Sequence, residues 1–284
     1  MTSKPAQRPR VLTSTAGLLR ASHLPPTVAV VALTTGLAAL NGRAEIGCIA
    51  VAVAVLSGQL STGWSNDWFD AERDRSVGRT DKPIAAGLVT VSTVRTASFL
   101  ALVACVPLSL LSGWRATAVH LVAIGSAWAY NAGLKGTILS PLPYGLSFAL
   151  LPAFVTLAPP TQAWPRPGLM AAACLLGVGA HFINTLADRD DDHATGVRGL
   201  PQRMPSTSVI IVGVGLLGGC AAAIWTLGGS SRSWSGLLFV GCLMTDLGVV
   251  GTAIAGRPRL AWILTLVSVV GCLGLFGALR PSLI

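Results

Sequence analysis

Charge is scarce in this chain, and negative charge is scarcer than positive. Of its 284 residues, 11% are charged and 52% are hydrophobic, whereas about a quarter of the residues in a soluble domain are charged. This deficit excludes an ordinary soluble domain and indicates a protein that crosses a membrane several times. The net charge of +9 does not indicate nucleic-acid binding, because the basic residues are dispersed in loops between apolar runs and no soluble domain remains to carry a basic patch.

Paired cysteines and a cleavable leader are also missing. The six Cys residues stand singly inside hydrophobic segments and form no CxxC pair, which favours buried, inert thiols over disulfides or a zinc site. Residues 1–20 are basic and polar and lack the apolar stretch of a signal peptide. We therefore expect residues 1–22 to form a cytoplasmic tail and residues 23–284 to form one transmembrane domain.

Apolar segments long enough to cross a bilayer occupy most of the chain. A membrane-spanning helix needs about 20 mainly apolar residues. Nine segments meet this condition: roughly 24–41, 46–65, 91–112, 116–132, 139–158, 168–187, 207–229, 234–255 and 260–279. The predicted fold is thus an all-α polytopic membrane protein with nine transmembrane helices.

The basic residues predict how these helices are oriented. If the helices alternate in direction, fifteen Lys and Arg residues fall on one side of the membrane: Lys4, Arg8, Arg10, Arg20, Arg73, Arg75, Arg79, Lys82, Arg95, Lys135, Arg189, Arg198, Arg203, Arg257 and Arg259. The other side has five: Arg43, Arg115, Arg166, Arg232 and Arg280. Because cytoplasmic loops are enriched in Lys and Arg, we expect the N-terminus in the cytoplasm of a bacterial-type cell membrane.

Nine of the eleven acidic residues lie in two short clusters on this cytoplasmic side. The clusters are Asn66-Asp67-Trp68-Phe69-Asp70-Ala71-Glu72-Arg73-Asp74, with Asp81 close behind, and Asp188-Arg189-Asp190-Asp191-Asp192. Carboxylates repel one another and are costly to desolvate, so a positive group is expected between them. Clustered hard oxygen ligands suggest Mg²⁺.

The spacing within each cluster predicts a one-sided stripe of ligands. Asp67, Asp70 and Asp74 follow an i, i+3, i+7 pattern, which places them on one helix face. Asp188 and Asp192 are four residues apart, and helical steps back from Asp188 reach Asn184 and His181. A solvated loop of paired Asp and Arg residues is the simpler alternative. The nearby Arg and Lys residues favour a site for a polyanion, in which Mg²⁺ bridges carboxylate and phosphate oxygens.

At these residues the chain resembles the UbiA superfamily of intramembrane prenyltransferases. The first cluster is similar to that family's NDxxDxxxD motif, followed by Arg79-Thr80-Asp81-Lys82-Pro83, and the second is similar to its DxxxD motif. Tyr130-Asn131-Ala132-Gly133-Leu134-Lys135 resembles a segment that lies between them, and Leu18-Leu19-Arg20 resembles the region before the first helix. The resemblance covers most of the chain, with the motifs in the family's order.

The resemblance implies a helical bundle around a central cavity that is open to lipid. Two Mg²⁺ ions would hold the diphosphate of a polyprenyl donor, and the prenyl group would pass to a small acceptor, with aromatic acceptors among the candidates. The implied metal ligands are Asp67, Asp70, Asp74, Asp188 and Asp192, with Asn66 as a further site residue. The implied diphosphate partners are Arg79, Lys82, Lys135 and Arg20.

Further polar residues are candidates for the cavity wall. Asp246 falls near the middle of the segment 234–255, and an ionisable group at that depth is a functional candidate; the alternative is a protonated Asp that is hydrogen-bonded to a neighbouring helix. His181 and Asn184 share the face of Asp188. Tyr130 and Asn131 belong to the segment that the family resemblance singles out.

Two other functions stay open at this point. A membrane terpene cyclase would use the same ionisation of a diphosphate, without an acceptor. Only two Tyr and seven Phe residues are available to stabilise a carbocation, which mildly disfavours that reading. A transporter of Mg²⁺ or of a polyanion would need charged residues through the whole membrane. The acceptor, the length of the donor and the oligomeric state are not determined by the sequence.

Overall fold

The structure is a computed structural model that describes residues 10–228, 234–279 and 282–284. The described residues form α-helices and two short 3₁₀ helices. The α-helices are α1 (Arg10–Ala21), α2 (Leu24–Leu40), α3 (Glu45–Phe69), α4 (Ala71–Ser76), α5 (Val91–Leu110), α6 (Trp114–Ala132), α7 (Pro141–Thr156), α8 (Pro167–Asn184), α9 (Arg189–Ala194), α10 (Ser206–Leu227), α11 (Ser235–Ile254) and α12 (Pro258–Leu279). The 3₁₀ helices are η1 (Leu134–Gly136) and η2 (Pro201–Arg203).

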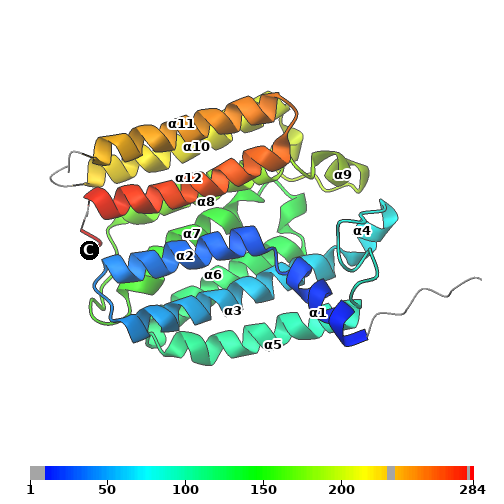
Figure 1. The fold of residues 1–284 in the computed structure, drawn as a ribbon, viewed down its shortest axis with the longest axis horizontal. Coiled ribbons are helices and arrows are strands. Elements are labelled where there is room, and N and C mark those ends of the chain that lie inside the picture. The colour runs from blue at the N-terminus through cyan, green and yellow to red at the C-terminus, as the bar shows by residue number, and fades with distance from the viewer. Residues whose placement is uncertain (1–9, 229–233, 280–281) are drawn as a thin grey trace, which may run out of the picture.

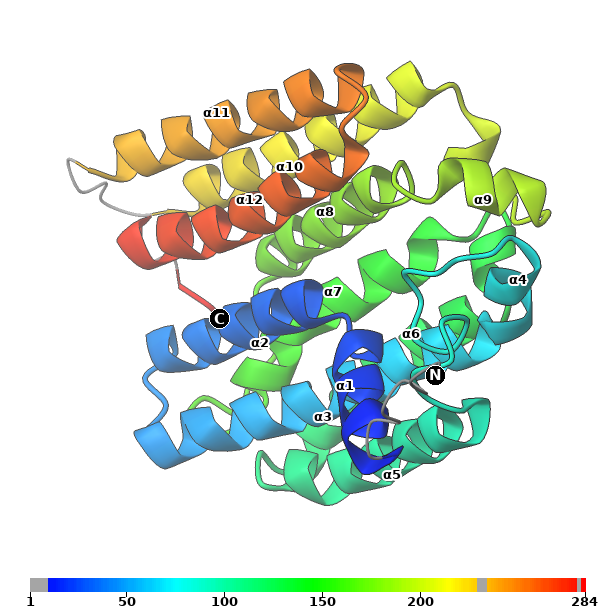
Figure 2. The same ribbon diagram turned by 45° about the vertical axis from the view of Figure 1, so that its right-hand side comes forward.

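The long helices run roughly alongside one another and form a closed ring of neighbours (Figure 1). In chain order, α2 packs on α3, α3 on α5 and α6, α6 on α7, α7 on α8, and α8 on α10. The ring closes where α12 packs against both α2 and α8. The short helices α4 and α9 lie together at one end of the bundle, as Figure 2 shows after a turn of the view. Both acidic clusters are therefore brought to the same end.

Each of the nine predicted segments is a helix, but length and composition support fewer membrane spans. Six helices of the described residues are long and apolar enough to cross a membrane, or seven if the bent pair Ser14–Ala21 and Leu24–Leu40 is counted as one span. The helices that do not qualify alone include α7, with 16 residues. An integral membrane protein follows from these helices; the count of nine spans stays a prediction.

The predicted tail, residues 1–22, lies only partly in the described structure. Residues 1–9, with Lys4 and Arg8 of the charge count, lie outside the described residues, as do Arg232 and Arg280. Residues Arg10–Ala21 form helix α1, and the chain turns by 58° between α1 and α2. His23 occupies the left-handed region at this turn, with φ of 49°, which directs its side chain toward the end of α3.

The predicted breaks between helices are made by proline and glycine. Gly256, with φ of +70°, separates α11 from α12, and Pro258 takes the first position of α12. A positive φ suits glycine because glycine has no Cβ. Proline is tolerated in the first turn of a helix, because the backbone N–H that it lacks would have no partner within the helix there. All six Cys residues are free; four of them are buried, and Cys48 and Cys174 are half-buried.

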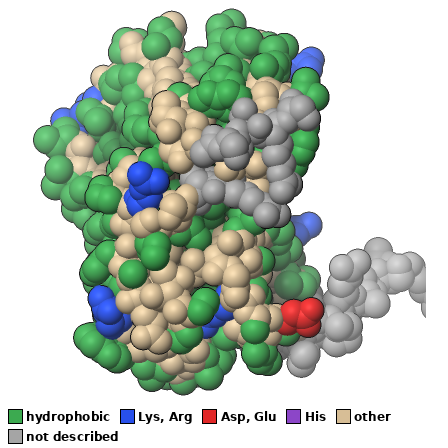
Figure 3. All heavy atoms as spheres, turned by 90° about the vertical axis from the view of Figure 1, so that its left-hand side faces the viewer, with side chains coloured by type: hydrophobic (Ala, Val, Ile, Leu, Met, Phe, Trp, Pro, Cys, Tyr) green, Lys and Arg blue, Asp and Glu red, His purple; other side chains and the backbone are tan. Residues whose placement is uncertain are grey.

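The outer surface is apolar where helices face away from the bundle. Leu100, Val103 and Leu237 are among the large hydrophobic side chains that are exposed, which suits contact with lipid tails. Figure 3 shows the end of the bundle opposite α4 and α9: in its described part, hydrophobic and uncharged side chains dominate and little acidic charge is present. The acidic residues gather at the other end.

Close approach of α7 and α8 depends on a residue without a side chain. A Cβ on Gly177 of α8 would lie 2.6 Å from the carbonyl oxygen of Tyr144 and 2.7 Å from the Cβ and Cγ of Phe148, both on α7. Small residues at such positions let membrane helices pack closely. The ring of Phe148 therefore rests directly on the backbone of α8.

We expect Gly177→Ala to destabilise the protein by about 1–3 kcal/mol, because α7 and α8 would have to separate. Gly215→Ala on α10 is the matched control, since a Cβ there meets nothing within 4 Å. Thermal unfolding in detergent should show a lower Tm for Gly177→Ala only. Equal Tm values for the two variants would contradict the packing described for Gly177.

Candidate active site

The first acidic cluster lies at a helix break but keeps one buried face. Helix α3 ends at Phe69 and α4 begins at Ala71. The N–H of Asp70 still donates to the carbonyl of Asn66 (3.0 Å), and the N–H of Asp74 donates to that of Asp70 (2.8 Å). Helical spacing thus continues across the break. Asp67, Asp70 and Asp74 are 2%, 5% and 2% exposed, so the solvated-loop alternative does not describe them.

An aromatic cluster on the opposite side fixes the orientation of this motif. Trp68 and Phe69 stack with ring centroids 4.5 Å apart, and both contact Trp128 of α6. Trp68 also contacts Phe99 of α5. These rings pack toward α5 and α6. The neighbouring Asp67 and Asp70 lie on the other face of the helix, so their carboxylates face the bundle interior.

The second cluster contributes one buried carboxylate. Helix α8 ends at Asn184, and Asp188 caps α9. Asp192 is 7% exposed, and its Oδ2 accepts a hydrogen bond from Nε2 of Gln202 at 2.8 Å. The side chains of Asp188 and Asp191 are both 44% exposed. The predicted stripe from His181 to Asp192 is therefore interrupted, since α8 and α9 are separate helices.

Arg73 joins the two clusters. Its Nη2 donates to Oδ2 of Asp70 at 2.9 Å and lies 3.6 Å from Oδ1 of Asp74, while its Nη1 donates to Oδ1 of Asp192 at 3.4 Å. In the sequence, Arg73 is a basic residue inside the first acidic cluster to which the family resemblance assigns no role. The guanidinium is the positive group that the buried carboxylates require.

Three predicted diphosphate partners surround the same carboxylates. Nζ of Lys82 donates to Oδ1 of Asp67 at 2.9 Å, and Nζ of Lys135, on η1, donates to Oδ1 of Asp70. Nη1 of Arg79 lies 3.1 Å from a carboxylate oxygen of Asp188 and 3.1 Å from one of Asp191. The loop after α4 and the loop after α6 thus bring cations onto both acidic clusters.

Burial and mutual attraction shift the pKa values of the buried carboxylates and cations. Burial raises the pKa of Asp74, and the positive charges of Lys82 and Arg73 offset only part of this. Burial also lowers the pKa of Lys135, against the attraction of Asp70. Burial acts in the same direction on Lys82, yet the pKa of Lys82 is raised because the negative charges of Asp67, Asp74 and Asp188 together outweigh burial. Perturbed groups of opposite charge in one buried place are typical of functional sites.

Asp70, Arg73, Lys135 and Asp192 line one end of a cavity of about 400 Å³ inside the bundle, whereas Asp67, Asp74, Asp188, Arg79 and Lys82 do not line it. Of the predicted residues, Asn66, Asp70, Tyr130, Asn131, Lys135, Asn184 and Asp192 line it. Asn131 also connects α6 to α3: its Nδ2 donates to Oγ of Ser65 at 2.8 Å, and its Oδ1 accepts from Nδ2 of Asn66 at 3.2 Å. Away from the charges, the wall includes Val30, Phe148, Leu266 and Val269. The cavity is therefore charged at one end and apolar at the other.

Three predicted site residues lie elsewhere. Arg20 is exposed on α1 and does not line the cavity. His181 is fully buried behind the rings of Tyr130 and Tyr144, with Nε2 3.2 Å from Oγ of Ser140. Asp246 lies between α11 and α12, where its Oδ1 accepts from Oγ of Ser268 at 2.8 Å. His181 and Asp246 are not among the residues that line this cavity, because the turn of each helix that carries them faces a neighbouring helix.

Further residues complete the site. His23 is a site candidate from its position near Arg20 at the entry to the first helix, and its Nε2 lies 3.0 Å from Oδ1 of Asp67. Gln202 binds Asp192 from η2 and Tyr144 lines the cavity from α7. Neither residue lies in a motif, so only the folded chain could bring them to the site.

The residues present suit Mg²⁺. Asp67 Oδ2 and Asp74 Oδ1 are buried and have no hydrogen-bond partner, so each keeps an oxygen able to bind a cation. Within the described part of the chain, no three His, Cys, Asp or Glu side chains already converge on one point. Mg²⁺ does not need such a cage, because it is usually held by one or two carboxylates together with water and substrate phosphate oxygens.

The sequence matches a family of known proteins over most of its length. A model of the UbiA prenyltransferase family matches residues 12–255. The chain belongs to the UbiA prenyltransferase family. Membership indicates an enzyme of the prenyltransferase type in the membrane, and it confirms the resemblance noted for the two acidic motifs. No curated protein sequence matches the chain closely enough to count as a relative.

Solved structures with low sequence identity share the fold of this UbiA family member. A UbiA homologue from Aeropyrum pernix K1, in its apo form, is 18% identical with a TM-score of 0.71 over 87% of this chain and 94% of its own. A UbiA homologue from Archaeoglobus fulgidus, bound to GPP and Mg²⁺, is 12% identical with a TM-score of 0.67 over 91% and 99%. A digeranylgeranylglyceryl phosphate synthase is 15% identical with a TM-score of 0.64 over 95% and 99%.

We expect Arg73→Met to lower the free energy of unfolding by about 2 kcal/mol. Breaking a buried ion pair costs about 3–5 kcal/mol, and the side chain of Arg73 is 21% exposed, which reduces the cost. Added Mg²⁺ should stabilise this variant more than the wild type, because the cation can replace the lost charge.

Thermal unfolding in detergent, with and without MgCl₂, measures both effects. Arg75→Met is the matched control, since Arg75 lies on the same helix and is exposed. An Arg73→Met variant as stable as Arg75→Met, with the same response to Mg²⁺, would show that Arg73 does not balance the carboxylates.

Proposed function

We propose that this protein transfers a prenyl group from an isoprenoid diphosphate to a small acceptor within the membrane, with Mg²⁺ as its cofactor. The observation that carries the proposal is the cavity with buried carboxylates and cations at one end and an apolar wall at the other. A diphosphate with a hydrocarbon tail matches this cavity, because its head is charged and its tail is apolar.

The cations of the site would receive the diphosphate. Negative charge grows on the leaving diphosphate as the carbon–oxygen bond breaks, and fixed positive groups in a buried site stabilise that charge strongly. Lys82, Lys135 and Arg79 lie on loops at the charged end. Arg73 is the fourth cation, and it can exchange its carboxylate partners for phosphate oxygens.

The carboxylates would hold Mg²⁺. Asp67, Asp70 and Asp74 of the first cluster, with Asp188 and Asp192 of the second, are the proposed ligands for two ions. When bound, Mg²⁺ neutralises and polarises the diphosphate oxygens. The buried oxygens of Asp67 and Asp74 that accept no hydrogen bond support this assignment, as does the GPP and Mg²⁺ bound by the Archaeoglobus fulgidus relative.

Polar side chains in the middle of the cavity favour transfer over cyclisation. Gln59 and Thr62 of α3 and Ser147 of α7 line the cavity between its charged and apolar parts. A cyclase benefits from a shaped apolar pocket, because its carbocation is captured within the donor. Polar groups at this depth can instead orient an acceptor beside the reacting carbon. Tyr130, Asn131 and Asn184 extend this polar lining toward the charged end.

The proposed orientation places the charged end at the cytoplasmic face. It requires that all nine long helices cross the membrane, including α2, α6 and α7. The excess of Lys and Arg on the side of the acidic clusters supports it, and so does the meeting of α4 and α9 at one end of the bundle. A bacterial-type cell membrane is the proposed location.

We expect Asp192→Asn and Asp67→Asn each to lower diphosphate release at least about 100-fold, because each removes one negative ligand from a preorganised site. The matched controls are Asp190→Asn and Glu72→Gln, whose side chains are exposed within the same two motifs. Release is measured from the full chain in membranes with Mg²⁺ and geranyl diphosphate. Turnover near the wild-type rate in Asp192→Asn and Asp67→Asn would rule out this site.

Removal of the divalent cation should abolish release, and Mg²⁺ should restore it, because the cations of the chain alone leave the diphosphate incompletely neutralised. The measurement is diphosphate release after EDTA treatment and after addition of MgCl₂. A cyclic product made from the donor alone, without any acceptor, would assign the chain as a cyclase. Flux of Mg²⁺ or a polyanion in proteoliposomes, without prenyl chemistry, would assign it as a transporter.

A further inference from the structure

Arg189 belongs to the second acidic cluster, but in the described structure its guanidinium binds backbone carbonyls. Its Nη1 donates to the carbonyl of Pro201 at 3.2 Å, and its Nη2 donates to the carbonyls of Gln202, at 3.3 Å, and of Met204. Three carbonyls from one short stretch of chain use most of the donors of a guanidinium. Arg189 therefore fixes the segment that contains η2.

We call this segment, residues 199–204, the strap. It is also held by His193 of α9, whose Nε2 lies 2.9 Å from the carbonyl oxygen of Gln202. On the other side, Oγ of Ser140 accepts a hydrogen bond from the N–H of Leu200 at 3.1 Å, and Ser140 directly precedes α7. The strap is thus fastened to α9 and to the start of α7.

Gly199 brings the strap against the segment that carries Lys135. A Cβ on Gly199 would lie 2.5 Å from the carbonyl oxygen of Lys135 and 2.8 Å from Oγ of Ser140. A side chain there would push these segments apart, so the absence of a Cβ permits the contact. The strap therefore has a fixed place relative to a cation of the site as well as to the second acidic cluster.

Gln202 is the strap residue that reaches the site. It is 6% exposed and lines the central cavity, and its Nε2 donates to Oδ2 of Asp192 at 2.8 Å. The other oxygen of this carboxylate, Oδ1, meets Nη1 of Arg73 at the longer distance of 3.4 Å. One oxygen of Asp192 is thus held firmly, while the other has a weak partner that a stronger one can replace.

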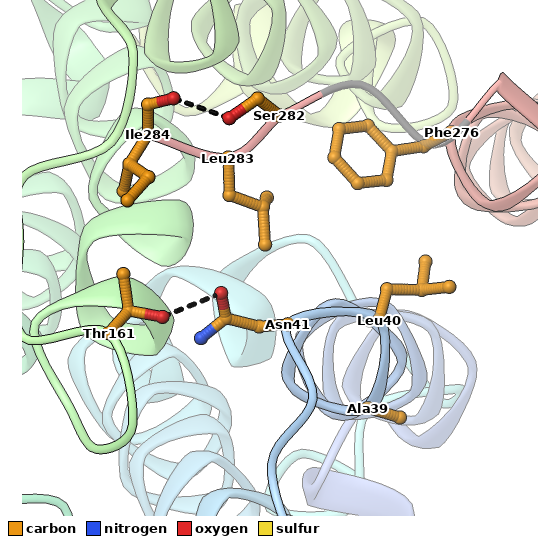
Figure 4. A pocket seen from close by; sticks show the side chains of 8 residues that line it. All are labelled: Ala39, Leu40, Asn41, Thr161, Phe276, Ser282, Leu283 and Ile284. Atoms are coloured by element: carbon orange, nitrogen blue, oxygen red, sulfur yellow. Dashed lines mark hydrogen bonds between the residues drawn. The ribbon is translucent and has the colours of Figure 1, made fainter.

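A pocket at the opposite end of the bundle provides a contrast. It has a volume of about 510 Å³, and the described residues that line it include no Asp, Glu, Lys or Arg. Two of its polar side chains bind each other, since Oγ1 of Thr161 donates to Oδ1 of Asn41 at 3.0 Å (Figure 4). The amide in that pocket orients a neutral hydroxyl, whereas the amide of Gln202 orients an acidic side chain that lines a cavity.

We propose that Gln202 is a positioning residue for the metal site: held by the strap, it fixes Oδ2 of Asp192 and keeps Oδ1 available to Mg²⁺. This proposal rests on the proposed function, because it takes Asp192 to be a ligand of the ion. Removal of a group that holds a metal ligand commonly weakens metal binding by about 10- to 100-fold. Mg²⁺ requires near-octahedral geometry and Ca²⁺ tolerates irregular sites, so a fixed carboxylate favours Mg²⁺ over Ca²⁺.

The test uses the full chain in detergent with inorganic diphosphate, and it measures Tm as MgCl₂ or CaCl₂ is added. Gln202→Leu removes the hydrogen-bond donor and keeps a similar side-chain volume. We expect the half-saturating concentration of Mg²⁺ to rise at least about tenfold in this variant, and that of Ca²⁺ to rise less. A loss of packing alone would lower Tm without metal and would leave both half-saturating concentrations unchanged.

Three further variants make the result specific. Arg203→Met is the matched control, because Arg203 belongs to the strap but is exposed and donates to the carbonyl of Arg198; it should bind both ions as the wild type does. Arg189→Lys should shift Mg²⁺ binding in the same direction as Gln202→Leu and by less, because one ammonium cannot span three carbonyls. In the Asp192→Asn background, Gln202→Leu should cause no further loss, because its effect passes through Asp192.

The outcomes separate the positioning role from the proposed function. Unchanged Mg²⁺ binding in Gln202→Leu, or in Arg189→Lys if Gln202→Leu does not fold, would overturn the role of Gln202. So would a loss that adds to that of Asp192→Asn. Diphosphate release from geranyl diphosphate would still support the proposed function in those cases. Conversely, weakened Mg²⁺ binding in Gln202→Leu, in a protein that does not cleave geranyl diphosphate, would support the role of Gln202 and reject the enzymatic function.

Discussion

Buried carboxylates in a bundle that faces lipid must be balanced by positive charge, and the rest of this structure depends on that balance. Asp67, Asp70, Asp74 and Asp192 are nearly inaccessible. Desolvating such groups without partners costs several kcal/mol each. Arg73, Lys82 and Lys135 supply the charge. Because these cations come from three different segments, the balance also fixes how the loops at this end fold over the bundle.

The same balance explains how an apolar protein can hold a polyanion. Each carboxylate–cation pair is a place where the partners can be exchanged: a divalent cation can join the carboxylates, and phosphate oxygens can join the Lys and Arg side chains. No new charge has to be buried when substrate and cofactor bind together. The repulsion among the clustered carboxylates is already offset by Lys and Arg side chains in the folded chain, before any ligand binds.

The apolar part of the cavity has a different origin. Its walls come from one face each of α2, α7, α8 and α12, and they include Phe148, which rests on Gly177. Sequence spacing indicates which residues of a helix share a face, but it does not say which neighbour that face meets. For this reason the shared buried face of Asp67, Asp70 and Asp74 follows from their spacing, while the neighbours of His181 and Asp246, Ser140 and Ser268, do not.

The sequence by itself determined the class of the protein, the positions of its long helices, the two acidic motifs and the family. Each of these follows from composition, from helical period or from residues close together in the chain. Only the tertiary structure decided that Arg73 joins the motifs, that His23 and Gln202 contact their carboxylates, and that Phe148 rests on the backbone of α8 at Gly177. These contacts join residues far apart in the chain or depend on which helix packs against which, and that choice is made by the fit of whole helix surfaces.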